Sequence, residues 1–249
     1  MSSGEKGVYM YFDRRIIYVI MAVMILAGIF NYLTDTSALI SLLLSIPGVL
    51  IAITFHEYAH AFAADKLGDD TPRMEGRLSL NPLKHLDPIG SVMLLFAGFG
   101  WGKPVHVNPR NYNREMSMEK ADAIVAIAGP LMNLFLAIVL TLIYCAIEKF
   151  FIITSTVGSI LMYMLLYAIS INIGLGVFNL IPLPPLDGSK VIKPFLPYNA
   201  KMWFENNERF CSIIFVILWI FGLLSIIISP IINLVYKGIM NLGFAIFGL

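Results

Sequence analysis

The segment HEYAH, residues 56–60, combines two histidines and a glutamate at a spacing that suits metal chemistry. His56 and His60 are four residues apart, so on a helix they lie one turn apart and only about 40° around the axis. Both imidazoles can therefore reach one metal ion. Glu57 points beside that face, where its carboxylate can take a proton from a metal-bound water without being a ligand. The motif predicts a metal-assisted hydrolytic site, and chance occurrence of the motif is the alternative.

The position of HEYAH at the end of a long apolar run favours the functional interpretation. An ionisable residue at the centre of a membrane helix costs about 2.5–3.5 kcal/mol on insertion scales, so three close together are typical of a functional site. A catalytic zinc needs a third protein ligand besides two histidines and water. Asp187, in the segment VFNLIPLPPLDGSKV, follows another apolar run and is our expected third ligand. An ordinary turn after a helix is the alternative for this segment.

The composition indicates an integral membrane protein. Of the 249 residues, 58% are hydrophobic and 13% are charged, whereas soluble domains average about one half and one quarter. The net charge of +1 gives no basic surface for nucleic acid. We expect an all-α fold with five to six membrane-spanning helices, forming one membrane domain over residues 1–249. The five clear spans are predicted at about 16–34, 38–64, 121–147, 156–182 and 210–235.

Two further apolar stretches are too short to be assigned as spans. Residues 238–249 are apolar, but their length does not decide whether they form a sixth span. Residues 88–101 are short and glycine-rich, and we expect them to dip into the membrane and return between the second and third spans. With the N-terminus in the cytoplasm, 15 of the 17 Lys and Arg residues fall on the inner side. This asymmetry predicts that the N-terminus and the metal site lie toward the cytoplasm.

Taken together, the motifs resemble those of the site-2 proteases, zinc metalloproteases that cut inside the membrane. The H-E-x-x-H pattern of that family matches residues 56–60, and its N-x-x-P-x-x-x-L-D-G pattern matches residues 179–188. The resemblance covers about residues 38–190 and is to the compact form without PDZ or CBS domains. It implies one zinc ion bound by the two histidines and Asp187, with Glu57 as general base and general acid.

The resemblance also implies roles outside the two motifs. In AIAGPLMNLFLA, Asn133 would hold or polarise the substrate carbonyl; an interhelical hydrogen bond is the alternative. The glycine-rich segment before it resembles the family's membrane-dipping hairpin. Its extended end would pair with a substrate strand, because a helix must unwind before its peptide bonds can be cut. The residues assigned to substrate binding there are Lys103, Pro104 and Val105.

Asn179 has two interpretations at the sequence level. It can orient Asp187 as a hydrogen-bond partner behind the metal ligand. Alternatively, it caps the end of the fourth span. The sequence does not separate the two.

The predicted function is a zinc-dependent intramembrane endopeptidase of a prokaryotic cell membrane, whose partners are the lipid bilayer and a membrane-protein substrate. A metal-ion transporter and a catalytically silent client-binding protein are the alternatives. Transporters commonly show paired repeats with broken helices, whereas this chain has one HEYAH and one LDG. The intact Glu57 argues against a silent protein. The sequence leaves open the substrate, the cleavage position, a prior cleavage, the organism and the oligomeric state, including a homo-oligomer.

Overall fold

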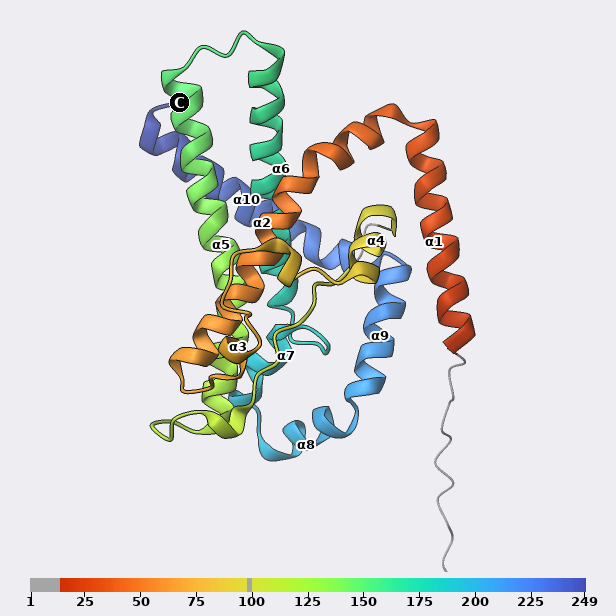
Figure 1. Cartoon of the computed structure of the whole chain (residues 1–249), viewed down its shortest axis with the longest axis vertical. Coiled ribbons are helices and arrows are strands. Elements are labelled where there is room, and N and C mark those ends of the chain that lie inside the picture. The colour runs from red at the N-terminus through yellow and green to blue at the C-terminus, as the bar shows by residue number, and fades with distance from the viewer. Residues whose placement is uncertain (1–13, 98–99) are drawn as a thin grey trace, which may run out of the picture. The chain divides into compact units, whose positions relative to one another are not determined.

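The structure is a computed structural model that describes residues 14–97 and 100–249. Within these ranges the chain is helical, and its β pairing is limited to an isolated bridge between Leu86 and Gly102. The expected all-α fold is confirmed. Figure 1 shows the arrangement of the helices. They are α1 (Arg14–Thr34), α2 (Thr36–Lys66), α3 (Thr71–Met74), α4 (Pro88–Ala97), α5 (Met118–Phe150), α6 (Thr156–Asn179), α7 (Asp187–Ile192), α8 (Tyr198–Asn206), α9 (Glu208–Ile220) and α10 (Leu223–Phe247), with 3-10 turns η1 (Pro82–Lys84), η2 (Pro109–Asn111) and η3 (Lys193–Phe195).

Four helices of the described ranges, α2, α5, α6 and α10, are long and apolar enough to cross a membrane. A shorter apolar helix covers Tyr18–Thr34 in α1. Many large apolar side chains on the long helices face outward: Phe135 on α5 is 59% exposed and Leu234 on α10 is 73% exposed. Large apolar side chains that recur outward along long apolar helices fit a lipid environment, since soluble proteins rarely expose large apolar patches. The expected membrane class is confirmed.

The last predicted span, residues 210–235, differs from the structure. The apolar run is divided at Gly222, which has a φ of +69° and separates α9 from α10. A left-handed backbone ends a helix, and glycine adopts it without steric cost. The long helix is therefore α10, which also contains most of residues 238–249. The stretch 88–101 forms the ten-residue helix α4, which is too short to span; residues 98–99 lie outside the described ranges.

The chain divides into two compact units. Unit 1 contains residues up to Ile40 and Asp87–Trp101. In it α1 packs against α4 at Gly28, where an added Cβ would lie only 1.7 Å from the Phe96 carbonyl oxygen. The Tyr32 hydroxyl donates to the Leu95 carbonyl at 2.7 Å.

Unit 2 contains Ser41–Leu86 and Gly102–Leu249. Its centre is the hairpin of α5 and α6, which lie side by side and are joined by residues 151–155 (Figure 1). α10 packs on both helices through a buried cluster that includes Ala137, Ile169 and Met240. α2 approaches α6 at Gly48, where an added Cβ would lie 2.7 Å from the Ala168 Cα. Small residues at such crossings let backbones approach closely, as is usual among membrane helices.

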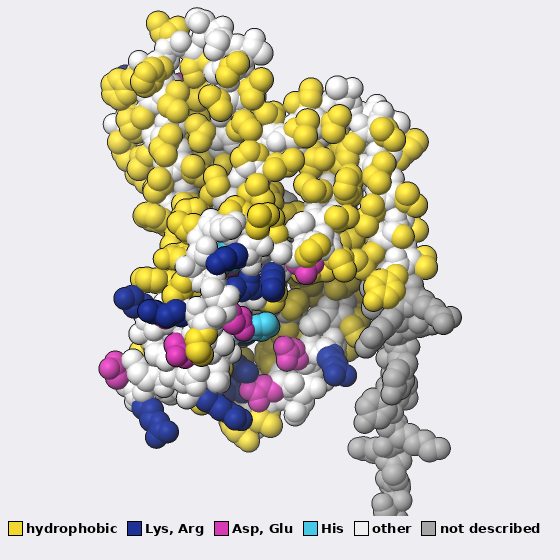
Figure 2. Space-filling view, viewed as in Figure 1, with side chains coloured by type: hydrophobic (Ala, Val, Ile, Leu, Met, Phe, Trp, Pro, Cys, Tyr) yellow, Lys and Arg dark blue, Asp and Glu magenta, His cyan; other side chains and the backbone are white. Residues whose placement is uncertain are grey.

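Charged side chains of unit 2 are concentrated at one end. On the face shown in Figure 2, the visible Lys, Arg, Asp and Glu side chains gather around α3 and α8, whereas hydrophobic side chains cover the long helices. This polar end includes the loop after α2. Asp69 is fully buried in that loop, and its carboxylate accepts hydrogen bonds from the Asn108 amide at 2.6 Å, the Thr71 hydroxyl at 2.6 Å and the Asn111 side chain at 3.0 Å. Asp69 therefore ties the end of α2 to the chain that leads into α5.

The first prediction concerns Asp69. Burial alone would raise its pKa, but the hydrogen bonds from Thr71, Asn108 and Asn111 outweigh burial and hold the pKa below its ordinary value. The ionised carboxylate therefore stabilises the fold at neutral pH, and this stabilisation is lost as the pH falls through the folded-state pKa. We expect Asp69→Asn to lower the free energy of unfolding by about 1–3 kcal/mol at pH 7, and by less in acid.

Denaturant or thermal unfolding in detergent at both pH values measures this difference. The matched control is Asp70→Asn, because Asp70 is the exposed neighbour of Asp69. An equal loss of stability in both variants would contradict the assigned role of Asp69.

Candidate functional site

Three potential metal ligands meet in unit 2. His56 and His60 lie one turn apart on α2, and Asp187 is the first residue of α7. The two Nε2 atoms are 3.1 Å apart, and Asp187 Oδ2 lies 3.1 Å from His56 Nε2 and 3.3 Å from His60 Nε2. Both histidines are largely buried, with exposed fractions of 6% and 9%. The fold thus brings together the three residues that the sequence predicts as metal ligands.

The loop between α6 and α7 returns Asp187 toward α2. α6 ends at Asn179, and the following segment contains Pro182, Pro184 and Pro185, which do not continue a helix. Gly188 packs directly on this segment, because an added Cβ would lie 2.4 Å from the carbonyl oxygens of Leu180 and Ile181. The glycine of the LDG motif therefore allows the turn that carries the carboxylate.

The second nitrogen of each imidazole contacts a protein acceptor. His56 Nδ1 lies 2.7 Å from Asn133 Oδ1, and His60 Nδ1 lies 2.8 Å from the Val125 carbonyl oxygen. Because both partners only accept, each Nδ1 carries the proton and donates it, which leaves the Nε2 lone pairs directed at Asp187. Histidines that bind metals usually donate their other N–H in this way.

The donor set fits a zinc ion. Two imidazole nitrogens and a carboxylate oxygen converge on one point, and a cation bound there would satisfy all three as ligands. Ligand bonds of 2.0–2.1 Å in a tetrahedral site place neighbouring donors about 3.3 Å apart. The observed separations of 3.1–3.3 Å agree with this value.

Gly129 on α5 provides the space beside the two imidazoles. An added Cβ at this position would lie 2.4 Å from His60 Nε2 and 2.7 Å from His56 Cε1. Any larger residue would therefore displace the nitrogen that faces the metal position. Gly129 is not part of a recognised motif, although a Gly-Pro pair within an apolar run is a signal of a close helix contact.

Asn133 lies behind His56 in a buried chain of amides. Its Nδ2 donates to the Ala52 carbonyl oxygen at 3.0 Å and to Asn172 Oδ1 at 3.0 Å, while its Oδ1 accepts from His56. Both Asn133 and Asn172 are fully buried. In this arrangement Asn133 orients a metal ligand and links helices, so its predicted contact with a substrate carbonyl would require it to give up one of these bonds. That contact stays a prediction.

Asn172 is a further residue of the site that lies outside the two sequence motifs. Its own Nδ2 donates to the Ala168 carbonyl oxygen at 2.8 Å, one turn earlier on α6, so its Oδ1 is directed at Asn133. A side-chain amide within the apolar run SINIGLGVFN was the available signal. Asn179, which the sequence offers as a partner of Asp187 or as a cap, donates to the Leu175 carbonyl oxygen at 3.0 Å within its own helix.

Glu57 is half-buried, and its carboxylate is hydrogen-bonded to the backbone of another segment. Its Oε2 accepts a hydrogen bond from the Val105 amide at 3.0 Å. Gly102 lies close by, since an added Cβ would be 3.6 Å from Glu57 Oε1. Of the residues predicted to bind substrate, Lys103 and Pro104 belong to the same irregular segment, between Gly102 and Val105. The structure therefore places this segment against the carboxylate of HEYAH.

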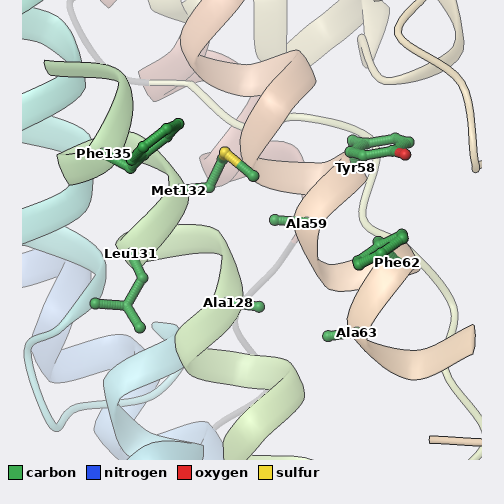
Figure 3. A pocket seen from close by; sticks show the side chains of 8 residues that line it. All are labelled: Tyr58, Ala59, Phe62, Ala63, Ala128, Leu131, Met132 and Phe135. Carbon is green, nitrogen blue, oxygen red and sulfur yellow. The ribbon is translucent and has the colours of Figure 1, made fainter. Parts of the chain in front are cut away.

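An apolar groove of about 290 Å³ lies between α2 and α5. Figure 3 shows Tyr58 and Phe62 on the α2 side and Leu131, Met132 and Phe135 on the α5 side. Its remaining lining residues are alanines. The groove holds no metal ligand or carboxylate, and we assign no chemistry to it.

The second prediction tests the space at Gly129. Gly129→Ala pushes a methyl group against the ligand nitrogen, so we expect the purified variant to lose most of the about one zinc per chain that the intact site binds. Metal analysis of the detergent-purified protein measures this loss. Gly174→Ala is the matched control, because an added Cβ at Gly174 has no neighbour within 4 Å. Full zinc content in Gly129→Ala would contradict the role assigned to Gly129.

The third prediction separates the two asparagines of α6. Asn172→Leu removes the acceptor that orients Asn133, and we expect zinc affinity to fall, by no more than the about 10- to 100-fold that follows loss of a direct hydrogen-bond partner of a metal ligand. Asn179→Leu should leave zinc affinity unchanged, since the amide of Asn179 bonds within its own helix. Competition with a chelating dye measures both affinities. The reverse ranking would make Asn179 the residue that orients a ligand.

Comparison with known proteins agrees with this chemistry. The model of Peptidase family M50 matches residues 146–222, which include α6 and Asp187. The chain is 37% identical over 202 residues to "Putative zinc metalloprotease YwhC" of Bacillus subtilis, covering 80% of this chain and 90% of that protein. It is 28% identical over 189 residues to "Putative zinc metalloprotease Rip2" of Mycobacterium tuberculosis, covering 71% and 70%.

An archaeal protein is similar as well. "Zinc metalloprotease MJ0392" of Methanocaldococcus jannaschii is 28% identical over 182 residues, which are 71% of this chain and 42% of that protein. No solved structure matches the chain. The identity to the Bacillus protein extends over most of both chains, and with the family match it shows that the chain belongs to peptidase family M50, the site-2 proteases, and is a zinc metalloprotease.

Proposed function

We propose that the chain hydrolyses peptide bonds of membrane-spanning proteins near the cytoplasmic face of a prokaryotic cell membrane. One observation carries this proposal: His56 and His60 are part of α2, a helix long and apolar enough to cross a membrane. His60 lies six residues before the end of α2 at Lys66, which is about 9 Å along the axis. A substrate that reaches this site must be cut inside the bilayer and near one of its surfaces.

Helix directions support the cytoplasmic assignment. Along α2 the contacts to α5 run from Ala52 with Asn133 to His60 with Val125, so these helices are antiparallel. The C-terminal end of α2 and the N-terminal end of α5 therefore share one side, and eight of the Lys and Arg residues lie between residues 66 and 120. Positive loops mark the cytoplasmic side.

The proposed ligands are His56, His60 and Asp187, which hold one zinc ion through the nitrogen and oxygen atoms that face each other. Zinc bound there lowers the pKa of water to about 7 and polarises a peptide carbonyl. Asn133 and the Val125 carbonyl keep both imidazoles in the tautomer that presents Nε2. Gly129 keeps the space in front of these nitrogens open.

Glu57 is the proposed general base and general acid. Its carboxylate takes one proton from the attacking water and later delivers that proton to the nitrogen of the departing chain. The water oxygen ends in the new carboxyl group, and the C–N bond breaks to give the new amine. The Val105 amide occupies Oε2 and thereby orients the carboxylate, so that Oε1 is available for the proton.

The substrate is proposed to be an unwound membrane segment beside the irregular segment at Lys103, Pro104 and Val105. In this structure four backbone groups of these residues already have bonds within the protein: the amides of Lys103 and Val105 and the carbonyls of Lys103 and Pro104. A substrate strand would therefore pair through second bonds to the carbonyls, or after some of these bonds open. Pairing of a substrate along these residues stays a prediction.

The fourth prediction tests the reaction in liposomes. The probes are synthetic single-span peptides with a fluorophore and a quencher, identical except for the depth of one Gly-Pro interruption of the helix. We expect the protein to cut peptides whose interruption lies near the membrane surface at the C-terminal end of α2, which is the proposed cytoplasmic side. Glu57→Gln should keep its zinc while kcat falls by about 10²–10⁴, because no group is left to move the proton.

Glu115→Gln is the matched control, since Glu115 is an exposed carboxylate outside the site. Cleavage by Glu57→Gln at the normal rate would refute the proposed mechanism. Cleavage of an unfolded soluble protein but of none of the membrane peptides would refute the intramembrane assignment and leave the metalloprotease activity intact.

A further inference from the structure

Arg77 is a buried cation outside the proposed catalytic machinery. It is 3% exposed, although arginine is rarely this buried without partners. Its guanidinium donates to three backbone carbonyls: Nη1 to Lys84, and Nη2 to Lys103 at 2.7 Å and to Pro104. These carbonyls belong to two segments that are distant in the sequence. A planar guanidinium suits this task, since its donors point outward in a fixed fork.

The two segments held by Arg77 are the points where the chain leaves unit 2 and returns to it. Residues 87–101 between them belong to unit 1. The same junction is joined by the bridge between Leu86 and Gly102 and by the Lys103 amide, which donates to the His85 carbonyl at 2.7 Å. The returning chain is therefore fixed within unit 2 by several bonds.

Arg77 and Glu57 hold opposite edges of one peptide group. The Pro104 carbonyl that accepts from Arg77 and the Val105 amide that donates to Glu57 belong to the same peptide bond. That bond is trans, because the one cis bond in the described ranges joins Pro184 and Pro185. In a trans peptide the C=O and N–H are coplanar and point in opposite directions. Fixing the oxygen therefore fixes the direction of the N–H.

We propose that Arg77 is a positioning residue of the active site: it holds the Pro104–Val105 peptide plane so that the Val105 amide orients the carboxylate of Glu57. The inference rests on the proposed function in that Glu57 is the base. Hydrogen bonds in series polarise one another, so a guanidinium on the oxygen also makes the N–H a better donor to the carboxylate. Arg77 acts on the reaction through Val105.

The test compares substitutions at two arginines of the same loop region. Arg77→Met keeps a side chain of similar length but removes all hydrogen-bond donors. Arg77→Lys keeps the positive charge but loses the planar guanidinium that donates to several carbonyls at once. Arg73→Met is the control, because Arg73 is exposed and pairs with Asp65 through bonds of 2.8 and 2.7 Å. For each zinc-loaded protein we measure kcat and KM on the liposome probe peptides, zinc content, melting temperature and hydrogen exchange of the Val105 amide.

For Arg77→Met we expect kcat to fall about 10- to 100-fold, as for a catalytic group that has lost its alignment. KM should stay within about twofold, because substrate binding is not the step affected. Zinc content should be unchanged, and the Val105 amide should exchange faster. Arg77→Lys should give a smaller change in the same direction, and Arg73→Met should match the wild type in kcat and Val105 exchange.

Unchanged kcat or unchanged Val105 exchange in folded Arg77→Met would overturn the proposal. A parallel loss of kcat and zinc would show a merely structural role and overturn it too. If Arg77→Met does not fold, Arg77→Lys decides, and wild-type kcat and exchange in that variant would also refute it. The proposed function is tested separately, because its failure would appear as normal cleavage by Glu57→Gln. The exchange rate of the Val105 amide does not depend on that result.

Discussion

The close approach of α5 to the imidazoles of α2 is the constraint on which the site depends. One face of α5 presents Val125, Gly129 and Asn133 at intervals of four residues, so the three positions align along the helix. The Val125 carbonyl accepts a hydrogen bond from His60, and the Asn133 side chain accepts one from His56. Gly129, between them, leaves room for both imidazole rings. A small rotation of α5 would therefore take both acceptors away from the Nδ1 atoms and would bring a larger side chain against the Nε2 atoms.

This arrangement also explains how apolar helices accommodate so many polar groups. In hydrocarbon an unsatisfied polar atom costs several kcal/mol, so polar side chains must find partners inside the bundle. Asn172 donates to its own helix and accepts from Asn133, which in turn bonds α2 twice. The polar atoms are thereby linked from α6 through α5 to α2, while outward positions of the same helices remain apolar. Helix packing and ligand orientation are achieved by the same bonds.

The sequence predicted the parts of the site that depend on local spacing. The interval between His56 and His60 sets a shared helix face, and the charge asymmetry placed Asp187 at a similar depth. By contrast, Gly129 and Arg77 matter through neighbours that are distant in the chain, and a local pattern such as the Gly-Pro pair does not identify those neighbours. The helical class and three of the long spans followed from apolar runs. The last span was predicted wrongly, because the apolar run continues through Gly222 and gives no sign that this glycine has a left-handed backbone.

The bonds that join the two ends of residues 87–101 have a consequence for how this chain can vary. Loop-closure entropy grows only slowly with length, and here both ends of the excursion are anchored beside each other within unit 2. The hydrogen bond between Val105 and Glu57 and the bonds that close the junction are all made within unit 2. The length and sequence of residues 87–101 are therefore constrained less by the contacts of Glu57 than the residues at the junction are.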